Sequence, residues 1–124
     1  MKFNDEIPLF LQIERELKEQ IISGALKEEE PIPSIRTMAK EYRINPNTVS
    51  RAVTNLVNDG ILFKKRGIGL FVVKGASIKL KKKAIEYFKE VELKSCIIHG
   101  KKLGIKKEEI KEEIEKVFDI TEEK

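Results

Sequence analysis

The sequence of 124 residues contains one cysteine, one histidine and no tryptophan. A single cysteine, Cys96, excludes a disulfide within the chain and is typical of the reducing cytoplasm. No apolar run approaches the roughly 20 residues that a membrane-spanning helix needs, and the first six residues lack the pattern of a signal peptide. We therefore expect a cytoplasmic protein that does not enter a membrane.

Groups that carry catalysis or bind metals are equally scarce. Cys96 and His99 lie three residues apart, on one face of a predicted helix, but two ligands alone do not make a metal site. We interpret Cys96 as a small residue at a helix contact. The sequence has no recognisable nucleophile–base pair, phosphate-binding loop or cluster of metal ligands. It therefore predicts neither an enzyme nor a protein that holds a cofactor or a metal.

Arginine is rare too, and its placement is uneven. The chain has 20 lysines and five arginines, and four of the five arginines fall within residues 32–75. This segment carries eight basic and two acidic residues, a net charge of +6, whereas residues 1–31 carry −4 and residues 76–124 carry +2. The arginine side chain is a planar fork that suits phosphates and guanine edges. We therefore expect the middle third of the chain to contact a polyanion.

Helical periodicity, by contrast, is abundant. Apolar residues at four-residue spacing predict a helix over about 8–23, which Gly24 ends. Ser34 is a suitable N-cap for a second helix over about 35–42. The segment 25–33 between them contains two prolines and three glutamates and is expected to be a turn or an extended connector.

A third predicted helix follows after a short turn. Asn45 has the residue type of an N-cap, Pro46 suits the first helical position, and Asp59 marks the end. The polar face of this helix contains no acidic residue, although 21 of the 124 residues are Asp or Glu. Two helices joined by a short turn, the second with a polar face of this kind, indicate a helix-turn-helix. The residues of this polar face are Asn47, Thr48, Ser50, Arg51 and Asn55.

The next segment, "ILFKKRGIGLFVV" (61–73), predicts a β-hairpin with Gly67 and Gly69 at its tip. A basic run, Lys64, Lys65 and Arg66, lies along one edge and at the tip. A lone hairpin is barely stable, so this one must pack against the helices. A helix-turn-helix followed by a basic hairpin is a winged helix. The predicted fold class is therefore mainly α with a small β-hairpin.

Periodicity after Gly75 predicts two further helices, over about 78–102 and 107–118, with Gly104 between them. Gly100 either lies inside the first of these helices or breaks it. We predict a winged-helix domain over 1–75 and a helical dimerisation tail over 76–124. The apolar stripes of the tail, which would form the dimer interface, consist of Leu80, Ala84, Tyr87, Phe88, Val91, Ile98, Ile110, Ile114 and Phe118. Because two helices offer few walls for a cavity, we expect no dedicated effector domain, although a small pocket at the interface stays open as an alternative.

Three motifs in a fixed order identify a family resemblance. "IPSIR" (32–36), "NPNTVSRAV" (45–53) and "RGIGLFV" (66–72) resemble the DNA-binding domain of the GntR family of bacterial transcription regulators. The preceding "PLFLQIERELKEQIISGAL" (8–26) resembles the first helix of that family, and the two-helix tail is similar to the dimerising tail of its YtrA subfamily. The resemblance implies a winged helix-turn-helix that binds a double-stranded DNA operator as a homodimer.

The resemblance also implies which residues of the helix-turn-helix contact DNA. Arg36 would face the DNA backbone or a guanine, and Ser34 would cap its helix, contact DNA, or do both. Four residues would enter the major groove, where Arg and Asn suit base edges and hydroxyls suit phosphates. These four are Asn47, Thr48, Ser50 and Arg51.

The wing has its own implied contacts. Lys65 and Arg66 would neutralise phosphates. Gly67 and Gly69 would either let the backbone approach the minor groove or serve only the geometry of the turn. An acid-free helix face beside such a wing is expected where the partner is a polyanion, since a carboxylate would be repelled.

Three functions are compatible with this pattern. The leading hypothesis is a homodimeric regulator, a repressor, that binds an inverted-repeat operator. One alternative is a winged helix that binds another protein, for which a basic wing is unnecessary. The other alternative is a protein that coats DNA without regard to sequence. Selection of DNA from a random pool separates the three hypotheses.

Overall fold

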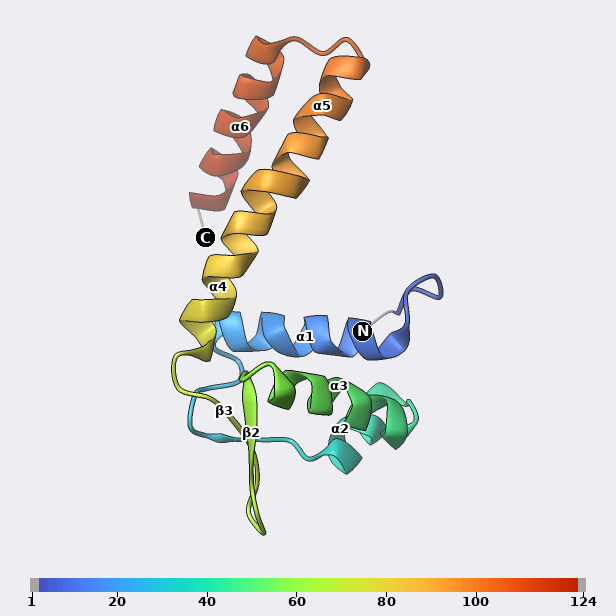
Figure 1. The fold of residues 1–124 in the computed structure, drawn as a ribbon. Helices are drawn as coiled ribbons and strands as arrows, with labels where there is room; N and C mark the ends of the chain where they lie inside the picture. Colours follow the sequence, from blue (N-terminus) through green and yellow to red (C-terminus); the bar gives the residue numbers. More distant parts are fainter. Residues whose placement is uncertain (1–2, 123–124) are drawn as a thin grey trace. The chain divides into compact units, whose positions relative to one another are not determined.

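Residues 3–122 are described by a computed structural model, in which the first of two compact units ends at Lys83 and the second begins at Ala84. Figure 1 shows the elements in chain order: α1 (Leu9–Ser23), β1 (Pro31–Ile32), α2 (Ile35–Tyr42), α3 (Pro46–Asn58), β2 (Leu62–Lys65), β3 (Gly69–Val72), α4 (Ala76–Tyr87), the π-helical segment η1 (Phe88–Leu93), α5 (Lys94–Lys102) and α6 (Lys107–Glu122). None of the helices in this part of the chain has the length and apolar character that crossing a membrane requires.

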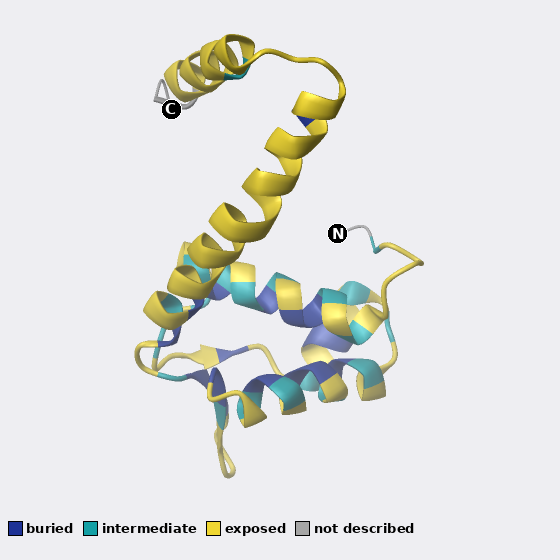
Figure 2. Cartoon of the chain, turned by 45° about the horizontal axis from the view of Figure 1, so that its top comes forward, coloured by how far each residue is buried: buried dark blue, intermediate teal, exposed yellow. Residues whose placement is uncertain are grey.

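The core of the first unit is formed by the apolar stripes of its helices. In α1, Ile13, Leu17 and Ile21 are buried at the predicted four-residue spacing. α3 packs against α1 and buries Val49 and Leu56. Each buried side chain of this size contributes about 1.5–3 kcal/mol relative to an exposed one. Figure 2 shows this buried face along α1 and α3, and it also shows that the helices of the second unit are exposed along most of their length.

Side-chain caps define where the two helices of the helix-turn-helix begin. The Ser34 hydroxyl accepts a hydrogen bond from the backbone N–H of Thr37 at 3.1 Å. The Asn45 side-chain oxygen accepts one from the backbone N–H of Asn47 at 2.8 Å, and Pro46 occupies the first turn. The predicted starts of α2 and α3 are therefore confirmed. These caps satisfy N–H groups that have no partner within the helix.

The wing belongs to a three-stranded antiparallel sheet with the order β1-β3-β2. β2 and β3 form the predicted hairpin, with Phe63 opposite Phe71. β1 pairs Pro31 with Phe71 and Ile32 with Leu70, so the segment expected to be a connector contains a short edge strand. Proline is tolerated at such an edge because its missing N–H is not needed there. This extra strand covers the outer side of β3.

The loop before β1 also fixes the start of α4. The Glu28 carboxylate accepts hydrogen bonds from the backbone N–H of Gly75 at 2.9 Å and of Ser77 at 3.1 Å. These two bonds, the one from Gly75 first, hold the pKa of the Glu28 carboxyl below its ordinary value. Glu28 therefore acts as a cap for a helix that follows it by nearly fifty residues in the chain.

The first compact unit extends past Gly75 into α4. Ala76 and Leu80 lie in the hydrophobic core of the first unit, and Leu80 is only 6% exposed. The prediction that Leu80 belongs to the dimer interface is therefore wrong, because its own unit already covers it. The first unit ends at Lys83, whereas the predicted boundary follows Gly75. The first turns of α4 thus complete the core of the winged helix.

The helices of the second unit have well-defined ends. Gly100 lies within α5, so the helix does not break there. The backbone N–H of Ile105 bonds to the carbonyl of Gly100 at 3.0 Å, and that of Gly104 bonds to the carbonyl of Lys101 at 3.1 Å. With a positive φ of 84° at Gly104, these bonds form a Schellman motif. They direct the chain from α5 into α6.

Candidate nucleic-acid interface

The N-terminal part of α3 presents the predicted groove residues to solvent. Asn47 and Arg51 are exposed, and Thr48 and Ser50 are half-buried beside them. No acidic residue stands in the first turn of α3. The helix dipole places partial positive charge at this end, which favours a nearby anion. The local geometry is therefore that of a helix end suited to a phosphate-bearing partner.

At the start of α2, Arg36 is exposed, as predicted. The Ser34 hydroxyl accepts from Thr37 N–H and donates to the Thr37 hydroxyl at 2.9 Å. This confirms the cap function of Ser34 among the two functions left open. Contact of either residue with DNA stays a prediction.

Arg51 makes a contact that sequence reasoning missed. Its guanidinium carbon lies 3.7 Å from the ring centroid of Phe10, in α1. Phe10 is half-buried and packs against the hydrophobic core, and this packing restricts the position of the ring. Within residues 3–122 no ion pair engages Arg51. No periodicity or motif could reveal this pair, because the two residues come from helices far apart in the chain.

A second contact between α1 and α3 limits the acid-free face. The Asn55 side-chain N–H donates to the Glu14 carboxylate at 2.9 Å, and Glu14 is 7% exposed. Asn55 is therefore engaged by an acidic group from α1, although α3 itself carries no acid in this region. Glu14 lies 41 residues before Asn55 in the chain, so the residue pattern of α3 alone does not predict this neighbour. The face without negative charge is confined to the N-terminal turns of α3.

The tip of the wing is basic and turns on two glycines. Lys65 and Arg66 are exposed, and Gly67 and Gly69 adopt positive φ angles of 78° and 138°. A Cβ atom at either glycine would meet nothing within 4 Å, so the backbone angle rather than space requires glycine. This supports the turn function of these glycines. Figure 1 shows the hairpin extending beyond the helices of the first unit.

Stacked aromatic rings stiffen the wing. Phe63 and Phe71 stack with centroids 5.4 Å apart, on opposing strands. The Lys65 ammonium lies 5.3 Å from the Phe71 centroid, which is within the range of a cation–π contact. The base of the hairpin is therefore fixed, while its basic side chains reach solvent.

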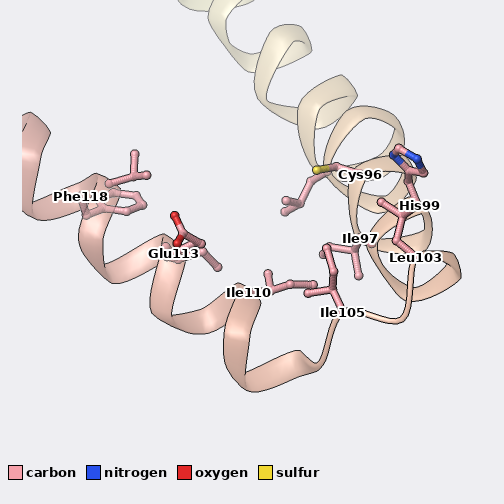
Figure 3. Close-up of a pocket in the computed structure, with 12 residues that line it drawn as sticks. Cys96, Ile97, His99, Leu103, Ile105, Ile110, Glu113 and Phe118 are labelled. Carbon is pink, nitrogen blue, oxygen red and sulfur yellow. The ribbon is translucent and has the colours of Figure 1, made fainter.

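The tail contains an exposed apolar groove between α5 and α6 (Figure 3). Its volume is about 490 Å³, and Ile110, Ile114 and Phe118 of the predicted interface line it. The other predicted residues of the tail, namely Ala84, Tyr87, Phe88, Val91 and Ile98, are exposed but lie outside this groove. The groove instead includes residues that the prediction omitted, namely Leu93, Ile97, Leu103 and Ile105.

The π-helical segment η1 changes the direction of the side chains that follow it. A π-type bond spans one residue more than an α-type bond. The six residues of η1 therefore rotate the following side chains around the helix axis relative to a regular α-helix. Ile98, placed on the stripe by α-helical spacing, does not line the groove, whereas Ile97 does. Cys96 and His99 border the same groove, and the described part of the chain contains no cluster of three or more ligands that could hold a metal.

Residues 9–72, from α1 to β3, match the profile of the family described as "Bacterial regulatory proteins, gntR family". The chain belongs to the GntR family. Its winged helix-turn-helix fold and the family predicted from the three motifs are confirmed. Because GntR-family proteins are transcriptional regulators, this chain is a DNA-binding regulator and not an enzyme.

Two relatives and one solved structure illustrate the extent of the similarity. The chain is 33% identical to the transcriptional repressor YtrA of Bacillus subtilis (strain 168) over 110 residues, which is 89% of this chain and 84% of YtrA. It is 44% identical to the repressor NagR of the same organism over 68 residues, 55% of this chain but only 28% of NagR. The structure of a GntR-family regulator from Listeria monocytogenes has a TM-score of 0.77 at 28% identity, covering 92% of this chain and 98% of that one.

Proposed function

We propose that this GntR-family regulator is a cytoplasmic repressor that binds an inverted-repeat operator as a homodimer. The N-terminal end of α3 gives this proposal its strongest support. It exposes Asn47 and Arg51 without an acidic neighbour in its first turn, in the same compact unit as a basic wing. The repressor function is supported by the names of the relatives YtrA and NagR.

Within this proposal the two groups of DNA contacts have different tasks. Asn47 and Arg51 contact base edges, where a bidentate arginine–guanine pair contributes about 1–3 kcal/mol of discrimination. Arg36 contacts the DNA backbone or a guanine. Thr48, Ser50 and the wing residues Lys65 and Arg66 contact phosphates and fix the position of the protein on the duplex. Gly67 and Gly69 keep the wing tip narrow enough to approach the minor groove.

The homodimer is supported by the amount of apolar surface on the tail. Tyr87, Phe88 and Ile98 are each about half exposed or more, and Ile114 and Phe118 are similarly exposed on α6. Large apolar side chains exposed on one part of a surface are typical of a site of protein association. Similarity to YtrA extends over 89% of the chain, so it includes most of the tail. A second copy of the same tail is the proposed partner.

A small-molecule effector forms no part of the proposal. The α5–α6 groove has a volume within the range of ligand pockets, about 300–1,000 Å³. Its lining is almost entirely apolar, however, and it lies on the surface that the dimer would bury. A dedicated effector domain is not proposed for this chain.

Selection from a pool of random duplexes with the full-length protein tests the proposal. Recovery of an inverted repeat supports it. Recovery of DNA without any consensus would instead favour a protein that coats DNA. Failure to retain DNA at low salt would favour a winged helix that binds another protein. Sedimentation in the same buffer must give a dimer, and a monomer would contradict the proposal.

A further inference from the structure

Phe10, the ring beneath Arg51, has no task in the function proposed above. The guanidinium carbon lies 3.7 Å from the ring centroid, a distance at which the cation sits directly over the face of the ring. Phe10 packs against the hydrophobic core, whereas Arg51 is exposed. The guanidinium carries five N–H donors, and because the Arg51 side chain is exposed, these donors can bond to another group while the carbon lies over the ring.

We propose that Phe10 is a positioning residue for DNA recognition, which holds the Arg51 guanidinium ready to bond to a base edge. The proposal rests on the proposed function, in which Arg51 contacts a base. A flexible arginine loses rotamer freedom when it binds, and this loss weakens binding. Stacking on Phe10 restricts the side chain before DNA arrives, so less freedom is lost on binding. Phe10 itself does not touch DNA in this proposal.

The alternative is that the pair only clamps α1 to α3. Other contacts already join these helices: the hydrogen bond from Asn55 to the buried Glu14 and the packing of Ile13 and Leu17 in the common core. A clamp formed by an exposed arginine would add little to that buried contact. The arrangement is better explained by the exposed donors of Arg51 than by a need to hold the helices together.

The test uses full-length protein and two duplexes, the inverted repeat recovered by selection and a scrambled sequence of the same length. The quantity compared is the preference, the ratio of the two dissociation constants. Phe10→Leu keeps an apolar side chain but removes the aromatic face, and we expect it to lower the preference by roughly two- to fivefold per half-site. Phe10→Tyr keeps the face and should retain the preference. Phe3→Leu is the matched control, because Phe3 is also a half-buried phenylalanine on the same core but contacts Tyr42 and not an arginine.

Arg51→Ala separates this proposal from the function on which it rests. With Arg51 absent, Phe10→Leu should cause no further loss of preference, since the ring has nothing to position. An equal loss with and without Arg51, or equal weakening on both duplexes, would overturn the positioning role and leave Phe10 as a packing residue. If Arg51→Ala alone left the preference unchanged, this result would contradict the proposed base contact of Arg51. It would also contradict the positioning role of Phe10, which depends on that contact. Thermal unfolding of each variant shows whether it is folded under the binding conditions.

Discussion

Arg51 and Lys65 are both exposed basic residues of the first unit, but their side chains differ in what they can recognise. Arg51 emerges from the first turns of α3 and rests on Phe10, whereas Lys65 lies at the end of β2 beside Phe71. The guanidinium has a fixed fork of donors that matches a base edge, while the ammonium is a hydrated point charge. Similar charge therefore leads to different expected effects on DNA binding.

We expect Arg51→Ala to cost about 1–3 kcal/mol per half-site on the operator and to relax the base preference at one position. Lys65→Ala should weaken operator and random DNA alike and flatten the salt dependence by about one unit per lost phosphate contact. Fluorescence titration of both duplexes at several salt concentrations measures these effects. Equal weakening of both DNAs by Arg51→Ala, with an intact consensus, would show that it is a phosphate contact.

Glu28 provides a prediction about pH. Its pKa is held below the ordinary value by the N–H groups of Gly75 and Ser77, so the folded state favours the ionised form. A lowered pKa in the folded state means that this stabilisation is present above the pKa of the unfolded chain, about 4.3, and is lost as the pH falls through the folded value. Glu28→Gln should lower the midpoint of thermal unfolding at pH 7, and the difference should shrink below about pH 4.

Glu30→Gln is the control for this comparison. Glu30 lies in the same acidic loop and is exposed. The Glu30→Gln variant should have the same midpoint of thermal unfolding as the native chain at pH 7 and at pH 3. A constant difference between Glu28→Gln and the native chain from pH 7 to pH 3 would show that ionisation of Glu28 does not stabilise the start of α4.

Two glycines near the end of α5 have opposite requirements. Gly104 has a φ of 84°, which side chains other than glycine rarely adopt. Gly100 is helical and buried, and a Cβ there would lie 3.5 Å from Ile110 Cδ1, an ordinary contact distance. One position requires glycine because of its backbone angle, and the other accepts a methyl group.

We therefore expect Gly100→Ala to raise the free energy of unfolding by about 1 kcal/mol, because alanine is the better helix former. Gly104→Ala should lower it by about 1 kcal/mol, because the residue would be forced into a left-handed conformation. Chemical unfolding at one fixed protein concentration measures both. Destabilisation by Gly100→Ala would mean that the contact with Ile110 is tighter than the structure indicates.

The helices of the winged domain could be predicted because their signals are local. A cap such as Asn45 and a stripe such as Ile13, Leu17 and Ile21 are fixed by neighbours along the chain, and the ends of α2 agree with the prediction. The strand β1 could not be predicted from its two residues, because pairing with β3 defines it. The pairs Phe10–Arg51 and Glu14–Asn55 likewise depend on how two distant segments pack.

The tail shows a different limit of sequence reasoning. A single α-helical period assigned Leu80, Ala84 and Ile98 to one stripe. Leu80 is buried in the core of the first unit. The π-helical turns of η1 rotate the side chains that follow, including Ile98, around the helix axis. A sequence period assumes one uniform helix, so it cannot reveal a change of helix type or of the unit to which a turn belongs.

The chain consists of two compact units, and we propose that the first binds DNA and the second pairs two copies of the chain. Binding of two linked half-sites is far tighter than binding of one, because the second contact becomes intramolecular. The tail would therefore act on DNA affinity without touching DNA.

A chain ending after Lys83 tests this division. It keeps Ala76 and Leu80, which complete the core of the first unit, so we expect a folded monomer. It should bind the recovered inverted repeat far more weakly than the full chain and no better than a half-site. A chain ending after Gly75 is the comparison, and it should be less stable by at least the burial of one leucine, about 1.5–3 kcal/mol. Sedimentation and thermal unfolding distinguish these outcomes.

We propose that a two-fold dimer presents two copies of α3 to an inverted repeat with half-site centres about one helical turn apart. The most direct measurement is a titration of a symmetric site, a half-site and a direct repeat with the full-length protein at two salt concentrations. We predict clearly tighter binding of the symmetric site and a log–log salt slope of about −5 to −7, from three or four phosphates per protomer. Equal affinity for all three duplexes would contradict the dimer on a symmetric operator, and a slope near zero would contradict contact of α3 and the wing with DNA.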